Sequence, residues 1–336
     1  MKPHRTSPLA PAEPPGDKTR NVSWKKRLWW ATGIATVVTI GLFMLVLNRF
    51  NFSYQRAPRV SKMQQWLGIV PTDSTQAIAE LNIPIIGHRG CGLSSADGNI
   101  AIGNTLTAIR KGIQAGADWI EIDVRRSRDD ILVVFHDETI KQRTTGKGKV
   151  SELTIADLKA VDILLKDQDP EKIPTLDEVF IEFGVGDHKW ILDIKETGLR
   201  ERLLPWVKQR FANDQVILFG TYDVLKEYKG EGYRLGYTVI YKDVGNRLSV
   251  LFRPSSILDH CEDLGCDLLV LPMIFANQYL INGANRKKIS VWTYDSEDAR
   301  DWRHCQLRGI RGLIVDDVQK AKELTGTSEA AQLNQE

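Results

Sequence analysis

Eight short apolar segments recur between residues 84 and 316, and stretches with helical periodicity separate most of them. Because strands that alternate with helices form parallel sheets, this order predicts an α/β fold. Eight such units within about 250 residues are typical of a closed TIM (β/α)8 barrel, which we place at residues 84–324. The predicted strands are Pro84–His88, Trp119–Val124, Trp190–Lys195, Val216–Gly220, Leu235–Ile240, Leu268–Pro272, Ile289–Tyr294 and Leu313–Asp316. The predicted helices are Asn104–Ala115, Leu199–Phe211, Pro254–Leu264, Asn277–Asn282, Glu297–Leu307 and Val318–Leu324.

A ninth apolar segment, Ile131–His136, does not fit a parallel barrel. Only the six residues 125–130 separate it from the second strand, whereas a parallel crossover needs about a dozen or more. We therefore predict an antiparallel hairpin inserted after strand 2. A turn centred on Asp129 and Asp130 places Asp123 opposite His136, so the hairpin returns a histidine to the second strand.

The second strand, Trp119–Val124, carries two carboxylates on one face. Successive side chains of a strand point to opposite faces, so Glu121 and Asp123 lie together, with Ile120 and Ile122 on the other face. Two neighbouring carboxylates in an apolar setting repel each other and are costly to desolvate. A hard, oxygen-binding cation such as Mg²⁺ or Ca²⁺ offsets both costs, so this strand predicts a metal site for phosphoester chemistry.

Two histidines lie at predicted strand ends close to these carboxylates. Active sites of such barrels lie at the carboxyl ends of the strands, and His88 ends the first strand while His136 ends the hairpin. We therefore interpret both as functional, although either one alone would more often be structural or solvated. The remaining histidines fall in the N-terminal tail, before a strand or within predicted outer helices: they are His4, His188, His260 and His304.

Three further polar side chains complete the predicted site. Asp193 and Lys195 share the inward face of the third strand, where Asp193 can add an oxygen ligand and Lys195 can neutralise a phosphate. The alternative is a buried Asp–Lys pair with a purely structural role. Arg89, next to His88, suits bidentate phosphate binding, and its alternative is a surface salt bridge.

The first 83 residues differ in character from the barrel. Residues 1–27 contain five of the 13 prolines and are expected to form a disordered, basic tail. The uncharged stretch Leu28–Leu47 is long enough for a bilayer, and Trp29 and Trp30 suit its interface, so residues 28–48 are predicted to be a transmembrane helix. A buried soluble helix and a cleaved signal peptide are the less favoured alternatives. Residues 49–83 are expected to be a juxtamembrane linker, and residues 325–336 a disordered tail.

Charge and cysteine content limit the partners and the location. Five basic residues lie just before the apolar span and four just after it, which favours a cytoplasmic N-terminus and an extracytoplasmic (periplasmic or extracellular) barrel. The whole chain has 45 basic and 43 acidic residues, so it lacks the strong positive field expected of a nucleic-acid-binding protein. The four cysteines, Cys91, Cys261, Cys266 and Cys305, lack zinc-site spacing, and a Cys261–Cys266 disulfide remains open.

Seven short motifs occur in a fixed order, and together they are far more specific than any one of them. They are His88–Gly90, Asn104–Leu106, Ala115–Val124, Val134–Asp137, Thr144–Lys149, Ile173–Glu178 and Val291–Thr293. In this ordered set, residues 84–324 resemble the glycerophosphodiester phosphodiesterase family. The resemblance implies metal-dependent hydrolysis of a glycerophosphodiester to sn-glycerol 3-phosphate and an alcohol.

The resemblance also implies a role for each site residue. His88 and His136 would be the acid–base pair, and one divalent cation, Mg²⁺ or Ca²⁺, would be the cofactor. The implied metal ligands are Glu121, Asp123 and Asp193. The implied substrate-binding residues are Arg89 and Lys195, which would hold the phosphate, and Trp292, which would line the pocket.

Two positions depart from the family pattern. The family usually has Glu where Asp193 stands, and it commonly has Glu where Gly103 precedes the Asn-Thr pair. A Gly103→Glu variant is therefore expected to fold and to have unchanged or raised activity. Two alternative functions remain: a lysophospholipase D-type hydrolase of lysophospholipids, which an anchor near lipid would favour, and a catalytically weak, membrane-anchored binding barrel.

Overall fold

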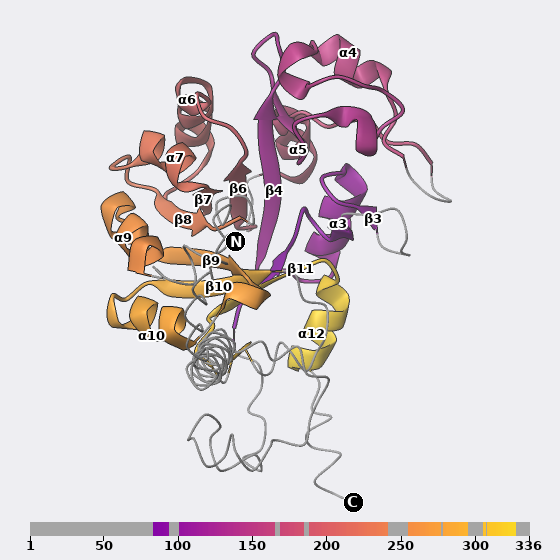
Figure 1. Cartoon of the computed structure of the whole chain (residues 1–336). Helices are drawn as coiled ribbons and strands as arrows, with labels where there is room; N and C mark the ends of the chain where they lie inside the picture. Colours follow the sequence, from indigo (N-terminus) through magenta and orange to yellow (C-terminus); the bar gives the residue numbers. More distant parts are fainter. Residues whose placement is uncertain are drawn as a thin grey trace, which may run out of the picture. The chain divides into compact units, whose positions relative to one another are not determined.

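In the computed structural model, eight parallel strands close into a barrel (Figure 1). The structure describes residues 83–93, 101–164, 169–184, 188–240, 255–276, 278–294, 305–306 and 308–326. The first strand in sequence pairs with both the second and the last barrel strand, which closes the ring and confirms the predicted barrel. The barrel strands are β1 (Ile85–Gly87), β4 (Trp119–Arg126), β6 (Trp190–Ile194), β7 (Val216–Gly220), β8 (Arg234–Thr238), β9 (Leu268–Pro272), β10 (Ser290–Tyr294) and β11 (Gly312–Val315).

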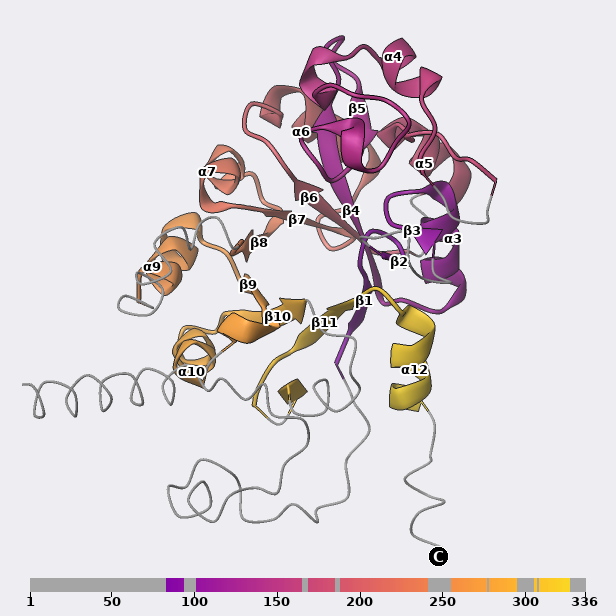
Figure 2. The ribbon, with the colours of Figure 1, turned by 45° about the vertical axis from the view of Figure 1, so that its right-hand side comes forward.

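Helices surround the ring of strands (Figure 2). Five of them occur where periodicity predicts them: α3 (Leu106–Gln114), α6 (Arg200–Arg210), α9 (Ser255–Leu264), α10 (Gln278–Arg286) and α12 (Val318–Gly326). The last of these shows that residues 325 and 326 are helical rather than part of a disordered tail. The predicted helix Glu297–Leu307 lies almost wholly outside the described residues.

Three described helices were not predicted from periodicity: α4 (Ile155–Ala160), α5 (Leu176–Phe183) and α7 (Tyr222–Leu225). They are short, so the apolar pattern repeats too few times to stand out. The first two begin with capping boxes, in which Thr154 pairs with Asp157 and Thr175 pairs with Glu178. The capping residues, rather than periodicity, are the sequence signal for these helices.

Alternation along each strand separates two apolar layers. In β6, Trp190, Leu192 and Ile194 belong to the layer between strands and helices, while Ile191 lies inside the barrel. The interior layer contains Ile86, Trp119, Ile191, Ile217, Phe219, Leu268, Val270, Trp292 and Ile314. The barrel is therefore filled by side chains, and any site must lie above this layer, at a strand end.

A short strand, β5 (Leu132–Val134), pairs antiparallel with β4. The register pairs Val124 with Val134, and the backbone N–H of Phe135 donates to the carbonyl of Asp123. Asp123 therefore lies opposite Phe135, and the expected pairing with His136 is wrong by one residue. The turn contains three residues between Ser127 and Ile131, with Asp130 left-handed at φ 65°, and such a turn sets a different register from a two-residue turn.

A small apolar cluster supports the chain beyond this hairpin. It contains Ile102, Val133, Phe135, Ile140, Val150, Leu158, Ile163 and Ile173, all buried. Because Phe135 belongs to it, the cluster fixes the backbone that carries His136.

The expected tail 1–27, transmembrane helix 28–48 and nearly all of the linker 49–83 lie outside the described residues. Within the described residues, none of the helices has the length and apolar character needed to cross a bilayer. Ile83, the one described residue of the expected linker, is buried in the barrel's outer apolar layer.

Candidate active site

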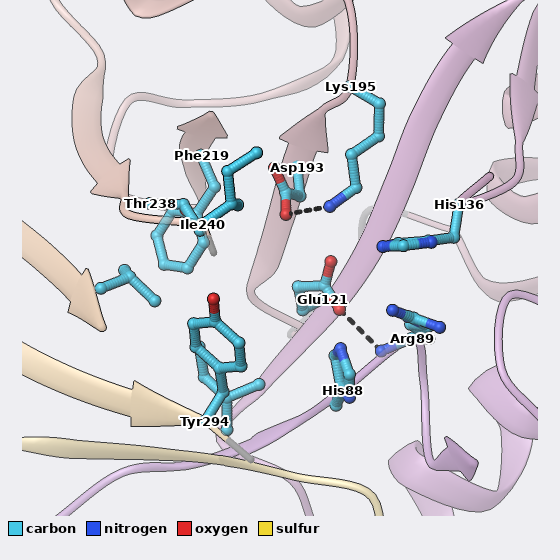
Figure 3. A pocket seen from close by; sticks show the side chains of 12 residues that line it. His88, Arg89, Glu121, His136, Asp193, Lys195, Phe219, Thr238, Ile240 and Tyr294 are labelled. Carbon is cyan, nitrogen blue, oxygen red and sulfur yellow. Dashed lines mark hydrogen bonds and ion pairs between the residues drawn. The ribbon is translucent and has the colours of Figure 1, made fainter. Parts of the chain in front are cut away.

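A pocket of about 120 Å³ opens at the carboxyl ends of the barrel strands (Figure 3). The side chains that line it are His88, Arg89, Glu121, His136, Asp193, Lys195, Phe219, Thr238, Ile240, Val270, Tyr294 and Ile314. The charged residues come from the ends of β1, β4 and β6 and from the hairpin. The apolar residues come from the opposite side of the ring, from β7 to β11. The mouth of the barrel is thus half charged and half apolar.

Three buried carboxylates form the base of the charged half. The exposed fractions are 3% for Glu121, 1% for Asp123 and 8% for Asp193. Asp123 and Asp193 are register partners on adjacent strands. One oxygen from each of the three carboxylates lies within 4.8 Å of the others. The donor set, three oxygens held close together away from water, fits one hard divalent cation.

Asp123 is the most heavily contacted of the three. Its Oδ1 lies 2.7 Å from Nζ of Lys195, and its Oδ2 lies 3.3 Å from Nε of Arg89. Asn104 donates from Nδ2 to the same Oδ2 at 2.6 Å. Burial raises the pKa of Asp123, but the opposing effects of its neighbours, Lys195 first among them, hold this pKa well below its usual value.

The pKa of Glu121 is shifted in the opposite direction from that of Asp123. Burial raises its pKa well above the usual range, and repulsion from Asp123 and Asp193 adds to that effect. The backbone N–H of Arg89 donates to Oε2 of Glu121 at 2.7 Å, but this single bond does not offset the repulsion. A bound cation would remove that imbalance, which is a second reason why these residues fit a metal.

Lys195 forms ion pairs with two of the three carboxylates, Asp123 and Asp193. Its Nζ lies 2.5 Å from Oδ2 of Asp193 (Figure 3). The same Nζ also contacts Asp123. Burial lowers the pKa of Lys195, but Asp123, Asp193 and Glu121 outweigh burial and raise it above its usual value. The Asp–Lys pair expected as an alternative does form, and both its members also line the pocket.

Each histidine is held by a carboxylate at its Nδ1 atom. Nδ1 of His88 lies 2.6 Å from Oδ1 of Asp316, and Nδ1 of His136 lies 2.6 Å from Oδ1 of Asp137. Nε of Arg143 donates to the second oxygen of Asp137 at 2.6 Å. A carboxylate at Nδ1 favours the tautomer protonated there, which leaves Nε2 as the nitrogen that can exchange a proton in the pocket.

The environment of His136 favours its neutral form. Burial lowers its pKa, and the opposing effects of Asp123 and Asp137 do not restore the usual value. Its backbone carbonyl accepts a hydrogen bond from Nε of Arg125 at 2.9 Å, which fixes the chain at this point. A neutral imidazole near pH 7 is suited to accept a proton.

Seven of the eight predicted site residues gather around this pocket, and Trp292 does not line it. Asp123 is not among the lining side chains, but it contacts two of them, Arg89 and Lys195. The indole of Trp292 is buried in the interior layer, 6.1 Å from the Phe219 ring between centroids, and Tyr294 takes the expected place in the wall. Both aromatic side chains of β10 point inward, and the register of the barrel decides which of them reaches the pocket.

Sequence reasoning missed the residues that hold the histidines. Asp137 follows His136 directly in the Val134–Asp137 motif, so its proximity was available as a signal. Asp316 is 228 residues from His88 in the chain, and no local pattern connects them. A Cβ atom at position 103 would lie 2.6 Å from Cβ of Arg89, so Gly103→Glu would require Arg89 to shift, and the expected effect of that variant on activity stays a prediction.

A closed α/β barrel with two carboxylate-held histidines beside a cluster of buried acids brings together the groups that acid–base hydrolysis requires. The comparisons with known proteins agree with this interpretation. The chain matches the model of the glycerophosphoryl diester phosphodiesterase family over residues 88–239.

Relatives cover the barrel as a whole. A glycerophosphodiester phosphodiesterase of Caldanaerobacter subterraneus subsp. tengcongensis is 29% identical over 245 residues, covering 69% of this chain and 93% of the relative. The crystal structure of a glycerophosphodiester phosphodiesterase from Thermotoga maritima has a TM-score of 0.58 and 28% identity, covering 72% of this chain and 98% of that one. An Oleispira antarctica phosphodiesterase, solved in complex with the product sn-glycerol-3-phosphate, shares the fold at 24% identity and a TM-score of 0.61, with 73% and 98% covered.

Proposed function

We propose that this enzyme hydrolyses glycerophosphodiesters to sn-glycerol 3-phosphate and an alcohol, with the help of one divalent cation. The observation that carries the proposal is the pair His88 and His136, each held at Nδ1, beside Arg89 and Lys195 and above three buried carboxylates. A relative of the same fold was solved with sn-glycerol-3-phosphate as its product, which supports the proposal.

The residues divide the chemical tasks. Hydrolysis forms a bond from a water oxygen to phosphorus and breaks the bond from phosphorus to the alcohol oxygen. His136, favoured in its neutral form, would take the proton of the attacking oxygen, and a protonated His88 would give one to the departing alcohol. Arg89 and Lys195 would offset negative charge on the phosphoryl oxygens.

Glu121, Asp123 and Asp193 would hold the cation, Mg²⁺ or Ca²⁺. When bound, it supplies positive charge to the phosphoryl oxygens and relieves the repulsion among the three carboxylates. Asp123 and Asp193 also keep Lys195 in place, so the same carboxylates serve both the cation and the phosphate-binding side chain.

The test is a hydrolysis assay of the full chain on glycerophosphocholine, with Mg²⁺, with Ca²⁺ and with chelator. We expect sn-glycerol 3-phosphate and choline to be released in equal amounts, only when a divalent cation is present. An Asp130→Asn variant, which removes an exposed carboxylate at the hairpin turn rather than one in the pocket, should behave as the wild-type chain does. The proposal fails if the wild-type chain hydrolyses no glycerophosphodiester with either cation.

A lysophospholipase D-type activity is the second candidate. The apolar half of the pocket favours it, because Phe219, Ile240, Val270 and Ile314 offer carbon surfaces to the group attached to the phosphate. The assay with lysophosphatidylcholine as substrate tests this candidate, with lysophosphatidate as the expected product. Binding of either compound without turnover would instead support the weak binding barrel.

We further propose that residues 28–48 anchor the enzyme in a membrane, with the N-terminus cytoplasmic and the barrel extracytoplasmic. The uncharged apolar stretch and its basic flanks support this proposal. Protease added to intact cells, or to spheroplasts where an outer membrane is present, should then digest the barrel. Protection of the barrel until the cells are lysed would reverse the orientation.

A further inference from the structure

Gly103 lies directly against the side chain of Arg89. A Cβ atom at position 103 would be 2.6 Å from Cβ and 2.9 Å from Cδ of Arg89, and 3.1 Å from the carbonyl oxygen of Gly92. Carbon atoms in ordinary contact are about 3.5–4.0 Å apart, so even a methyl group requires a displacement of about 1 Å. Gly103 is outside the left-handed region, so space, rather than backbone conformation, is what requires glycine here.

The backbone of Arg89 cannot easily yield to such a group. It is left-handed, with φ 52°. Its N–H donates to Oε2 of Glu121 at 2.7 Å, and its carbonyl accepts from the N–H of Asn104 at 2.8 Å. A non-glycine residue in this conformation is strained, so the surrounding contacts already hold Arg89 against that strain.

The side chain of Arg89 is the part that would move. It is 7% exposed, and its Nε lies 3.3 Å from Oδ2 of Asp123. Asn104, the neighbour of Gly103, also donates to that oxygen and accepts from the backbone N–H of Asp123. The segment that contains Gly103 is thus attached to Asp123, and a group added to it would push Arg89 away from Asp123.

We infer that Gly103 is a positioning residue: the space it leaves lets Arg89 lie against Asp123 and present its guanidinium group to the pocket. This inference rests on the proposed function, because it assigns to Arg89 the phosphate of the substrate.

The first test is the Gly103→Ala variant, measured for kcat, KM and inhibition by inorganic phosphate. A misplacement of about 1 Å can cost on the order of 10²-fold in rate, so we expect kcat/KM to fall by at least tenfold and phosphate inhibition to weaken. Gly283→Ala is the matched control. Its Cβ would be 2.6 Å from Cδ1 of Leu258, at the contact of two outer helices, so the same crowding occurs far from Arg89.

The second test removes the side chain that Gly103 accommodates. In an Arg89→Gly background the added methyl group no longer meets Cβ or Cδ of residue 89, and glycine is comfortable at φ 52°. We expect Gly103→Ala to lower kcat/KM and the midpoint of thermal unfolding in the wild-type chain. In the Arg89→Gly chain it should change both quantities much less.

The outcomes separate positioning from simple packing. The inference is supported if Gly103→Ala lowers both kcat/KM and the midpoint of thermal unfolding much more in the wild-type chain than in the Arg89→Gly chain. Coupling in stability alone, with wild-type kinetics and phosphate inhibition in Gly103→Ala, overturns it. If the wild-type chain has no phosphodiesterase activity, the proposed function fails instead. The inference can then still be tested by the rise in the midpoint of thermal unfolding that inorganic phosphate causes. If Gly103→Ala reduces this rise in the wild-type chain but not in the Arg89→Gly chain, the inference is supported. If Gly103→Ala has the same effect in both chains, the inference is overturned.

Discussion

Nδ1 of His88 lies 2.6 Å from Oδ1 of Asp316, although 228 residues separate them in the chain. His88 follows β1 and Asp316 follows β11, the two strands that pair where the last strand joins the first. The backbone N–H of His88 also donates to the carbonyl of Val315 at 2.9 Å. The pairing of β1 with β11 that closes the barrel therefore also brings Asp316 next to His88 and orients its ring.

Replacing Asp316 tests this relationship. An Asp316→Asn change keeps the shape but replaces the carboxylate that holds Nδ1 of His88, so we expect kcat to fall on the order of 10²-fold with a smaller change in KM. Asp317→Asn is the matched control, because Asp317 accepts from the N–H of Lys320 at the start of α12 and Asn can do the same. Equal activity of the two variants would contradict an orienting role for Asp316.

The histidine pair predicts a bell-shaped dependence of kcat/KM on pH. One ring must be neutral and the other protonated, and the lowered pKa of His136 assigns it the neutral role. The acid limb should therefore belong to His136. Either His→Ala variant should lose on the order of 10²-fold or more in rate, together with its own limb. A wild-type pH profile in His136→Ala would remove the hairpin from the mechanism.

Asp123→Asn should separate cation binding from folding. The substitution removes one of three oxygen ligands and leaves Lys195 paired with Asp193 only. We expect the calorimetric affinity for Mg²⁺ or Ca²⁺ to fall strongly and hydrolysis to be nearly abolished. Breaking a buried ion pair costs about 3 kcal/mol or more, so the variant should remain folded but unfold at lower urea. Full activity of this variant in chelator would contradict the metal site.

Acid should weaken the contact between Asp137 and its partners. Burial raises the pKa of the Asp137 carboxyl, but hydrogen bonds from His136 and Arg143 outweigh burial and hold this pKa well below its usual value. Its contribution to stability is complete above the ordinary Asp pKa of about 3.9 and is lost as the pH falls below that value. Asp137→Asn should therefore lower the free energy of unfolding by about 1–3 kcal/mol at pH 7.

The measurement for Asp137 is urea unfolding of wild type and variant at pH 7 and at pH 3. The difference between the two proteins should shrink at pH 3, because the Asp137 carboxyl of the unfolded wild-type chain, with the ordinary pKa of about 3.9, is then largely protonated. The exposed turn variant Asp130→Asn should show little difference at either pH. A loss that is equally large at both values would mean that the charge of Asp137 contributes nothing.

Local patterns in the sequence were sufficient for the barrel and for most of the site. The two-residue period places Glu121 and Asp123 on one face, and the same period places Asp193 and Lys195 beside them. These predictions succeed because parallel strands bring their carboxyl ends to one edge whatever their order. Apart from His136, which the hairpin supplies, the charged half of the pocket follows from that rule.

The sequence is a poor guide where the place of a side chain depends on strand register or on contacts with residues far away in the chain. Trp292 and Tyr294 share a face of β10, and only the stagger of the closed barrel decides which one reaches the pocket. Asp130 adopts a left-handed conformation that shifts the hairpin by one residue. The contact between Gly103 and Arg89 depends on how the loop after β1 folds back on the segment before α3 (Leu106–Gln114). None of these relationships has a local periodicity.

The half-charged, half-apolar mouth of the barrel has a consequence for how such an enzyme can change. The charged half comes from residues 88–195, and the apolar half comes from residues 219–314. Substitutions in the later segment can alter which alcohol group fits without touching the side chains that act on the phosphate. New substrates are therefore accessible to this scaffold, by mutation or by grafting the later strands of a relative, while the reaction itself is inherited unchanged.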